Sequence, residues 1–175
     1  NQWNAGPALP NAIRQGAAIV ANGKLFVMGG INESDPNVSY SDVWELDANG
    51  NQWVAKTPML LGRHGLKLLS YGGKIWAYST HHLQIYDVAQ DSWTLESGSI
   101  TDRHIPLFWE SNGYLYVGGG LNSDDVLQNI ERYDPKTKQW AAAGLLPEPK
   151  YIGGSVTLDD RIYIVAGRTT NDSNN

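Results

Sequence analysis

The stretch NGYLYVGGGLNSDDVLQNIERYDPKTKQW (residues 112–140) combines a tight turn, two apolar runs and a tryptophan. Asn112-Gly113 is typical of a two-residue hairpin turn, because a type I′ turn needs a positive φ at both central positions. The alternating aromatic and aliphatic run that follows ends at glycines, as a strand bounded by a loop does. A second run ends at Asp134, and Trp140 comes six positions later. The stretch therefore predicts three successive β-strands.

The same pattern recurs along the chain. Its first part occurs four times, as NGKLFVMGG (22–30), GGKIWAYST (72–80), NGYLYVGGG (112–120) and DDRIYIVAG (159–167). Its second part follows three of these, as WELDANGNQW (44–53), QIYDVAQDSW (84–93) and ERYDPKTKQW (131–140). The interval from a Trp to the middle of the next alternating strand is always 22 residues, counted from Trp3, Trp53, Trp93 and Trp140. This constancy predicts a structural repeat that supplies four short strands per copy.

A glycine doublet, a Tyr-Asp pair, a Trp six positions later and then a basic residue resemble the kelch repeat. The resemblance covers nearly the whole chain and implies an all-β fold, a β-propeller of four-stranded antiparallel blades. Three whole repeats and two partial ones are expected, at residues 11–57, 58–97 and 98–144, with a last strand in 1–10 and two first strands in 145–175. We expect one propeller domain over residues 1–175, part of a six- or seven-bladed ring. The alternative is a four-bladed ring closed by the two ends.

The four repeat tryptophans are expected to lie in the core, between neighbouring blades, because a buried aromatic side chain removes a large apolar area from water. They are Trp3, Trp53, Trp93 and Trp140.

Composition narrows the function. The chain has only 13 Lys and Arg against 18 Asp and Glu, and its net charge is −5. Binding to nucleic acid is therefore not expected. The chain has no Cys, which excludes disulfides, thiolate catalysis and the Tyr–Cys crosslink of a copper radical oxidase. No apolar run is long enough for a membrane span. We expect no cofactor and no metal, and an extracellular or periplasmic location is favoured.

Antiparallel strand order predicts which loops share a face of each blade. The loops after the glycines and the loops after the Trp strands should meet on one side. The second kind carries Arg63-His64, Arg103-His104 and Lys150-Tyr151, with the basic residue ten positions after the Trp each time. Arg14 lies eleven positions after Trp3, so either it points elsewhere or a bulge restores its direction.

In kelch relatives this face commonly binds partners, and the basic residue often lines the central mouth. The resemblance therefore implies a ligand-binding role for Arg63, Arg103 and Lys150, and cations at a concave mouth suit an anionic ligand. The alternative is that each basic side chain binds neighbouring loop carbonyls.

His81 and His82 lie side by side in a shortened loop. From the small-residue pair to the Asp the interval is 7 residues here, against 17 and 14 in the flanking repeats. We expect a plain short turn. The alternatives are one histidine lining the mouth and, least of all, a metal site, since adjacent side chains on an extended chain point to opposite faces.

Three function classes follow. The leading hypothesis is a non-catalytic module that binds a protein or glycan on the loop face, because loops of varied length on a constant scaffold are typical of binding sites. The second is a bacterial kelch-type sugar enzyme similar to a sialic-acid mutarotase, with His64, His104, Arg103 and a loop carboxylate as acid, base and anion clamp. The third is a surface adhesin or assembly component. The remainder of the ring, or a partner chain, is expected to cover the terminal blades.

Overall fold

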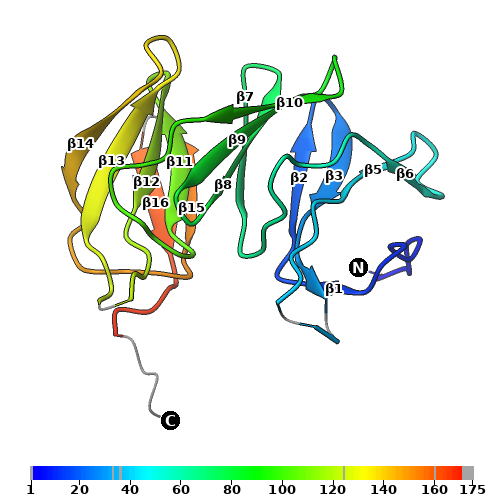
Figure 1. Ribbon diagram of the computed structural model, residues 1–175, viewed down its shortest axis with the longest axis horizontal. Helices are drawn as coiled ribbons and strands as arrows, with labels where there is room; N and C mark the ends of the chain where they lie inside the picture. Colours follow the sequence, from blue (N-terminus) through cyan, green and yellow to red (C-terminus); the bar gives the residue numbers. More distant parts are fainter. Residues whose placement is uncertain (1, 33, 36, 124, 160, 171–175) are drawn as a thin grey trace. The chain divides into compact units, whose positions relative to one another are not determined.

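The computed structural model describes residues 2–32, 34–35, 37–123, 125–159 and 161–170, and all regular structure in these ranges is β. The strands follow one another along the chain as labelled in Figure 1. They are β1 (Ile13–Arg14), β2 (Ala17–Ala21), β3 (Lys24–Met28), β4 (Ile31–Asn32), β5 (Val43–Leu46), β6 (Trp53–Ala55), β7 (Lys67–Tyr71), β8 (Lys74–Ser79), β9 (His82–Asp87), β10 (Ser92–Glu96), β11 (Leu107–Ser111), β12 (Tyr114–Gly118), β13 (Asn129–Asp134), β14 (Gln139–Leu145), β15 (Gly154–Leu158) and β16 (Arg161–Val165).

Three four-stranded sheets correspond to the three whole repeats. Their strand orders are β2-β3-β5-β6, β10-β9-β8-β7 and β11-β12-β13-β14. β15 and β16 form an antiparallel hairpin, and a short ladder pairs β1 with β4. The prediction of an all-β fold built from four-stranded antiparallel blades is confirmed.

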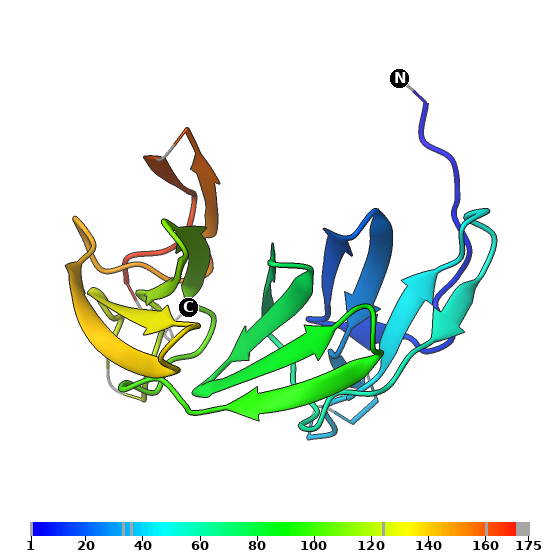
Figure 2. The ribbon, with the colours of Figure 1, turned by 90° about the horizontal axis from the view of Figure 1, so that it is seen from above.

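The chain divides into two compact units. The first consists of Asn1–Trp76 and Gln84–Thr94, and the second of Ala77–Leu83 and Leu95–Asn175. The first unit contains the sheet β2-β3-β5-β6. The second contains the sheet β11-β12-β13-β14 and the hairpin β15-β16, which are seen from above in Figure 2.

The hairpin turns have the backbone that their residues predict. Asn22 and Gly23 have φ values of 49° and 74°, and Asn112 and Gly113 have φ values of 52° and 80°. Asparagine and glycine tolerate this left-handed region better than other residues do. The turn signals in the sequence therefore set where β2 turns into β3 and where β11 turns into β12.

The repeated Asp closes the turn before each Trp strand. Asp134 Oδ1 accepts hydrogen bonds from the backbone N–H of Lys136 (2.8 Å) and of Thr137 (3.4 Å). These bonds, led by the one from Lys136, stabilise the carboxylate and lower the pKa of Asp134. Their contribution to folding is present at neutral pH and is lost as the pH falls through that lowered pKa. Asp87 accepts the N–H of Ala89, also two positions later (3.1 Å), whereas Asp47 accepts that of Asn51, four positions later (2.7 Å).

Three of the four repeat tryptophans connect consecutive repeats. Each is half-buried and donates its indole N–H to a backbone carbonyl four positions after the preceding Trp. The pairs are Trp53 with Pro7 (3.0 Å), Trp93 with Thr57 (2.8 Å) and Trp140 with Ser97 (2.8 Å). The regular Trp spacing thus lets each of these indoles make the same hydrogen bond to the preceding repeat.

The prediction for Trp3 is wrong. Its side chain is 100% exposed. β2 is the first strand of its own blade, and no described strand pairs with residues 2–6. Without neighbouring strands of a blade among the described residues, the Trp3 indole has no sheet to pack on.

The core of the second unit lies where β11 and β12 face the hairpin β15-β16. Leu107, Trp109 and Leu146 are buried there. Partly buried side chains pack around them, and these are Tyr116, Ile130, Ile162 and Ile164. The same period-two alternation that predicts the strands therefore places their apolar faces together.

The glycine doublets are required by a close approach of backbone. Gly29 and Gly119 have φ values of 59° and 63°. A Cβ on Gly29 would overlap the carbonyl oxygen of Arg63, and a Cβ on Gly119 would overlap that of Lys150. Because the obstacle is backbone of the next repeat, it cannot move aside as a flexible side chain would.

We expect Gly119→Ala to lower the free energy of unfolding by about 3 kcal/mol, because the new Cβ adds a left-handed strain to the overlap. Gly154→Ala is the matched control, since its Cβ would meet no atom closer than 3.9 Å. The control should change stability by less than about 0.5 kcal/mol. Denaturant unfolding of both variants measures this, and equal effects would contradict the packing role.

Candidate functional site

The two kinds of loop meet on one side of the first unit, as predicted. The loop after β3 and the loop after β6 are joined by a closed triangle of backbone hydrogen bonds. Gly30 N–H donates to Arg63 O (2.8 Å), Arg63 N–H donates to Tyr40 O (3.1 Å), and Tyr40 N–H donates to Gly30 O (2.8 Å). Each residue donates once and accepts once, so three loop segments hold one another.

The second unit contains the same triangle. Gly120 N–H donates to Lys150 O (2.8 Å), Lys150 N–H donates to Leu127 O (3.2 Å), and Leu127 N–H donates to Gly120 O (2.8 Å). The basic residue of each triangle is one that the sequence analysis places in the ligand site. The backbone N–H and C=O of this residue hold the loops together, whatever its side chain contacts.

The middle repeat is shorter, as its sequence predicts. β8 ends at Ser79 and β9 begins at His82, so Thr80 and His81 form a two-residue turn. Thr80 takes the place of the second glycine with a φ of 60°, and its carbonyl accepts the N–H of Arg103 directly (3.2 Å). The expected plain short turn is present.

A left-handed residue precedes the innermost strand in every repeat. These residues are Gln15 (φ 56°), Gly65 (61°), Ile105 (45°) and Ile152 (60°). A positive φ is unusual for a β-branched residue such as isoleucine, and it persists only where its surroundings impose it. The surroundings here include a further hydrogen bond between repeats, from Gly65 N–H to Gln15 O (2.9 Å) and from Ile152 N–H to Ile105 O (3.2 Å).

The left-handed residues show which position of the repeat Arg14 occupies. It directly precedes Gln15, just as His64, His104 and Tyr151 precede their left-handed residues. Arg14 therefore occupies the histidine position of the pattern and not the basic position, which Ile13 takes.

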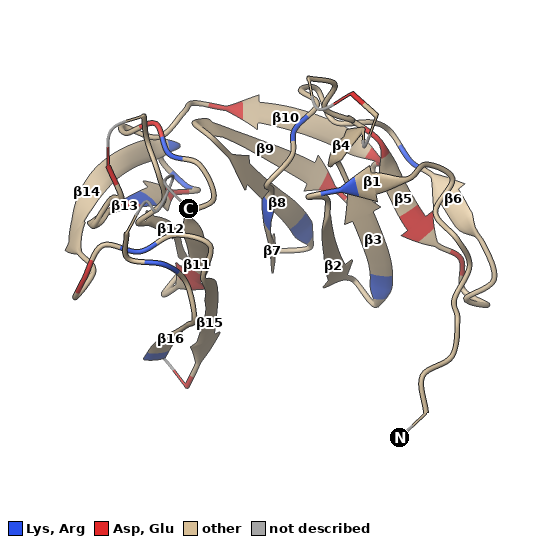
Figure 3. Ribbon diagram, turned by 90° about the horizontal axis from the view of Figure 1, so that it is seen from below, with Lys and Arg blue, Asp and Glu red and all other residues tan. Residues whose placement is uncertain are grey.

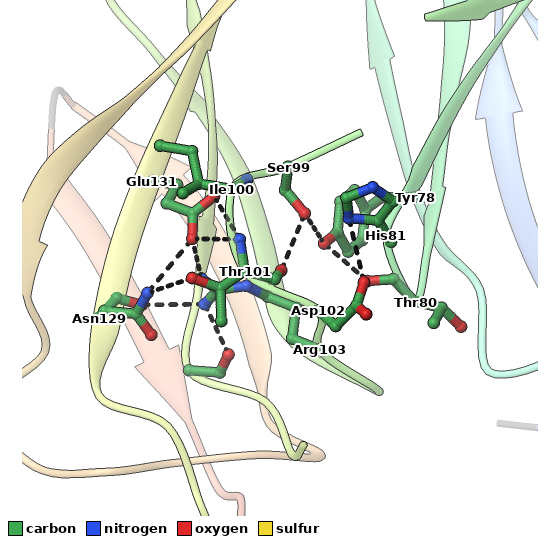
Figure 4. A network of polar contacts seen from close by, with 11 residues as sticks. Tyr78, Thr80, His81, Ser99, Ile100, Thr101, Asp102, Arg103, Asn129 and Glu131 are labelled. Atoms are coloured by element: carbon green, nitrogen blue, oxygen red, sulfur yellow. Dashed lines mark hydrogen bonds and ion pairs between the residues drawn. The ribbon is translucent and has the colours of Figure 1, made fainter. Parts of the chain in front are cut away.

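Figure 4 shows a buried network around Arg103 in the second unit. The Arg103 side chain is 0% exposed. Nη1 donates to the carbonyl oxygens of Gly119 (2.8 Å) and Asn129 (3.0 Å), and Nη2 lies 2.5 Å from Glu131 Oε1. The guanidinium thus binds loop carbonyls, the second of the two roles considered for the basic residues, and a carboxylate in addition.

Glu131 carries this network into the neighbouring loop. Its side chain is 2% exposed, and Oε2 accepts the N–H of Ile100 (2.7 Å) while Oε1 accepts that of Thr101 (3.1 Å). A buried carboxylate is tolerated when an opposite charge and several N–H groups replace its water. Glu131 therefore holds in place the loop that bears Asp102 and His104.

Tyr78 and Ser99 extend the network on the other side. The Tyr78 hydroxyl lies 2.6 Å from Ser99 Oγ and 2.8 Å from Thr80 O, and Ser99 Oγ donates to Thr101 O (3.0 Å). Burial raises the pKa of Tyr78 well above its usual value. The hydroxyl consequently stays protonated and remains a hydrogen-bond donor at physiological pH.

His81 lies at the exposed margin of the network. Its Nδ1 is 3.0 Å from Asp102 Oδ1, and its ring stands edge-on to that of His82 with the centroids 5.5 Å apart. A Cβ on Gly98 would overlap the His81 ring, so the imidazole rests on backbone. The His81 and Asp102 side chains are 41% and 74% exposed. Together they form an accessible polar pair at the loop that Glu131 holds in place.

The other candidate residues lie at different depths. His64 and His104 are exposed, and His64 Nδ1 lies 2.9 Å from Ser39 Oγ. Arg63 is half-buried and donates from Nη1 to Gly62 O (3.2 Å). Lys150 is also half-buried, and its Nζ lies 2.9 Å from Glu148 Oε1, whereas Tyr151 is only 4% exposed. No group of three or more His, Asp or Glu side chains able to hold a metal occurs in the described part of the chain.

Glu131 was not among the residues predicted for the site. A signal existed, because Glu131 stands three positions before Asp134 and, by period-two alternation, on the same face of its strand as the buried Tyr133. Gln84 stands three positions before Asp87 and is 1% exposed. Its amide accepts from Leu61 N–H (2.9 Å) and donates to Leu61 O (3.0 Å). A polar residue at this position therefore binds the preceding loop in both repeats.

A family model for the kelch motif matches residues 14–60 and 110–143. The chain is 26% identical over 164 residues to Kelch repeat and BTB domain-containing protein 8 of Danio rerio, covering 90% of the chain and 21% of that protein. It is 25% identical over 175 residues to Kelch-like protein 35 of Mus musculus, covering 95% and 29%. The chain thus spans about a fifth to a third of the length of the curated relatives it matches.

Among solved structures, the chain is similar to one described as "Structure of YjhT". The TM-score is 0.72 at 13% identity, and the match covers 97% of this chain and 82% of that one. Identity this low speaks for the fold alone. No described helix of the chain is long and apolar enough to cross a membrane.

We expect Glu131→Gln to lower the free energy of unfolding by about 3 kcal/mol, because it leaves the Arg103 charge buried without its carboxylate. Lys74→Ala is the control, since it removes an ion pair to Asp87 whose two side chains are 43% and 22% exposed. That change should cost less than about 1 kcal/mol. Urea unfolding distinguishes the two, and a Glu131→Gln effect no larger than the control's would contradict a supporting role for the buried pair.

Proposed function

From the premise that this chain belongs to the kelch-repeat family, we propose that it is a binding module. It presents the loops of one blade face to a protein ligand and catalyses no reaction. The observation that carries the proposal is the contrast between backbone and side chains on this face. The backbone triangles are the same in both units, whereas the side chains at equivalent positions differ.

The difference is clearest directly before the left-handed residues. Arginine, histidine, histidine and tyrosine follow one another there, at Arg14, His64, His104 and Tyr151. A constant frame with variable side chains is how binding loops obtain specificity without loss of stability. Loops already held in place also lose less conformational entropy when a ligand binds.

In the second unit the accessible group consists of Asp102, His104 and His81. Asp102 and His104 are exposed and lie in the loop that Glu131 holds, and His81 contacts Asp102. Arg103 lies between Asp102 and His104 in sequence but is buried beneath them. We propose that Arg103 positions this loop and that its neighbours contact the ligand.

The sugar-enzyme hypothesis gives Arg103 the part of an anion clamp, and the guanidinium is instead bound to Glu131. His64 and His104 keep exposed imidazoles that could act as acid and base. This alternative predicts faster anomer exchange of a sugar in NMR when the chain is added. A glycan ligand and an adhesin role stay predictions as well.

We expect the double substitution Asp102→Ala and His104→Ala to weaken partner binding at least about tenfold, because two exposed polar contacts are removed. The partner is first identified by a photo-crosslinking residue placed at position 104. Its affinity for each variant is then measured by biolayer interferometry.

The matched control carries Lys136→Ala and Thr137→Ala, two exposed residues in the turn at the opposite end of the same blade. It should bind like the unaltered chain. A loss of affinity in the control equal to that of the loop variant, or crosslinks to the same partner in equal yield from position 136, would refute the choice of face.

A further inference from the structure

β14 is an exposed and uncharged outer strand. It is last in the order β11-β12-β13-β14, so one of its edges has no partner strand among the described residues. Every residue from Gln139 to Leu145 except Trp140 is exposed. None of them is charged, and Figure 3 draws β14 in the colour of uncharged residues. Such an edge presents a row of free N–H and C=O groups to other strands.

The outer strands of the other two blades are shorter. β6 comprises Trp53–Ala55 and β10 comprises Ser92–Glu96, whereas β14 comprises Gln139–Leu145. Short edge strands are one of the ways in which proteins prevent edge-to-edge pairing.

The other two outer strands have a charge at their end or directly after it, which β14 lacks. Three positions after their Trp stand Lys56 and Glu96. Lys56 Nζ lies 3.3 Å from Asp91 Oδ2, and Glu96 Oε1 lies 2.8 Å from Lys138 Nζ. The third position after Trp140 is Ala143. A charged residue therefore stands at this position in two blades, and an alanine stands there in the third.

We propose that the free edge of β14 pairs with β14 of a second copy of this chain, in the antiparallel direction. The charges that flank the strand favour this occupant. Lys136 precedes it, Glu148 follows it, and both are exposed. Antiparallel pairing brings the lysine end of one copy to the glutamate end of the other, and a two-fold axis makes the contact occur twice.

Small side chains allow the two backbones to approach. The strand contains three alanines and a glycine, and Gln139 to Ala142 keep a regular register with β13. The one irregularity is a bulge, where Ala142 and Gly144 face Glu131 and Ile130. A bulge limits the length of the contact, so we expect a reversible dimer and not a permanent one.

Sedimentation velocity of the 175-residue chain tests the proposal. We expect the mass to rise with concentration from 19.2 kDa towards twice that value. Ala142→Lys and Ala142→Glu each place like charges opposite one another in the dimer and should raise its dissociation constant at least about tenfold. Ala55→Lys is the matched control, because it puts the same charge on an exposed alanine of β6 and should leave the dimer unchanged.

Mixing the Ala142→Lys and Ala142→Glu chains should restore dimers, because the charges are then opposite. This recovery also shows that both variants are folded. The proposal is overturned if the unaltered chain stays monomeric at every concentration, if Ala142→Lys dimerises as well as the unaltered chain, or if the mixture stays monomeric.

Discussion

A closed triangle of backbone hydrogen bonds is the interaction on which the candidate binding face depends. In the second unit it joins Gly120, Leu127 and Lys150, and in the first unit the equivalent residues form it again. The triangle connects the glycine-ended strand of one repeat, the loop that follows it and the first loop of the next repeat. The glycine doublet leaves room for this arrangement, because a Cβ on Gly119 would overlap the carbonyl oxygen of Lys150 and a Cβ on Gly120 would lie 2.9 Å from the carbonyl oxygen of His104. The glycine doublet is thus a consequence of how consecutive repeats meet.

Side chains add a second level of support beneath the loops. Arg103 and Glu131 are both buried, and between them they bind two carbonyls and two N–H groups of neighbouring segments. A buried pair of this kind contributes little net stability compared with an apolar packing, but it defines one arrangement of the groups that it contacts. Asp102 and His104, on either side of Arg103, can then vary in identity without disturbing the frame. This division between holding and presenting residues is what the proposed function rests on.

The sequence was sufficient to predict the strands, the turns, the repeat spacing and the face on which the loops meet, because these follow from alternation, from glycine and from antiparallel order. It was not sufficient to predict the exposure of Trp3, since the burial of a Trp strand depends on the other strands of its blade. It also could not decide whether the Arg103 guanidinium faces solvent or protein, because that depends on Glu131, which lies 28 positions away. The place of Arg14 in the repeat followed only from the left-handed residue after it.

The triangle should slow the hydrogen exchange of the three amides that form it. Hydrogen exchange followed by NMR measures each of them separately. If the triangle holds the loops, the N–H groups of Gly120, Leu127 and Lys150 exchange as slowly as those in the middle of β12, although none of the three lies in a described strand. Exchange of these amides at the rate of an open loop would contradict the account, because the loop face would then have no fixed frame.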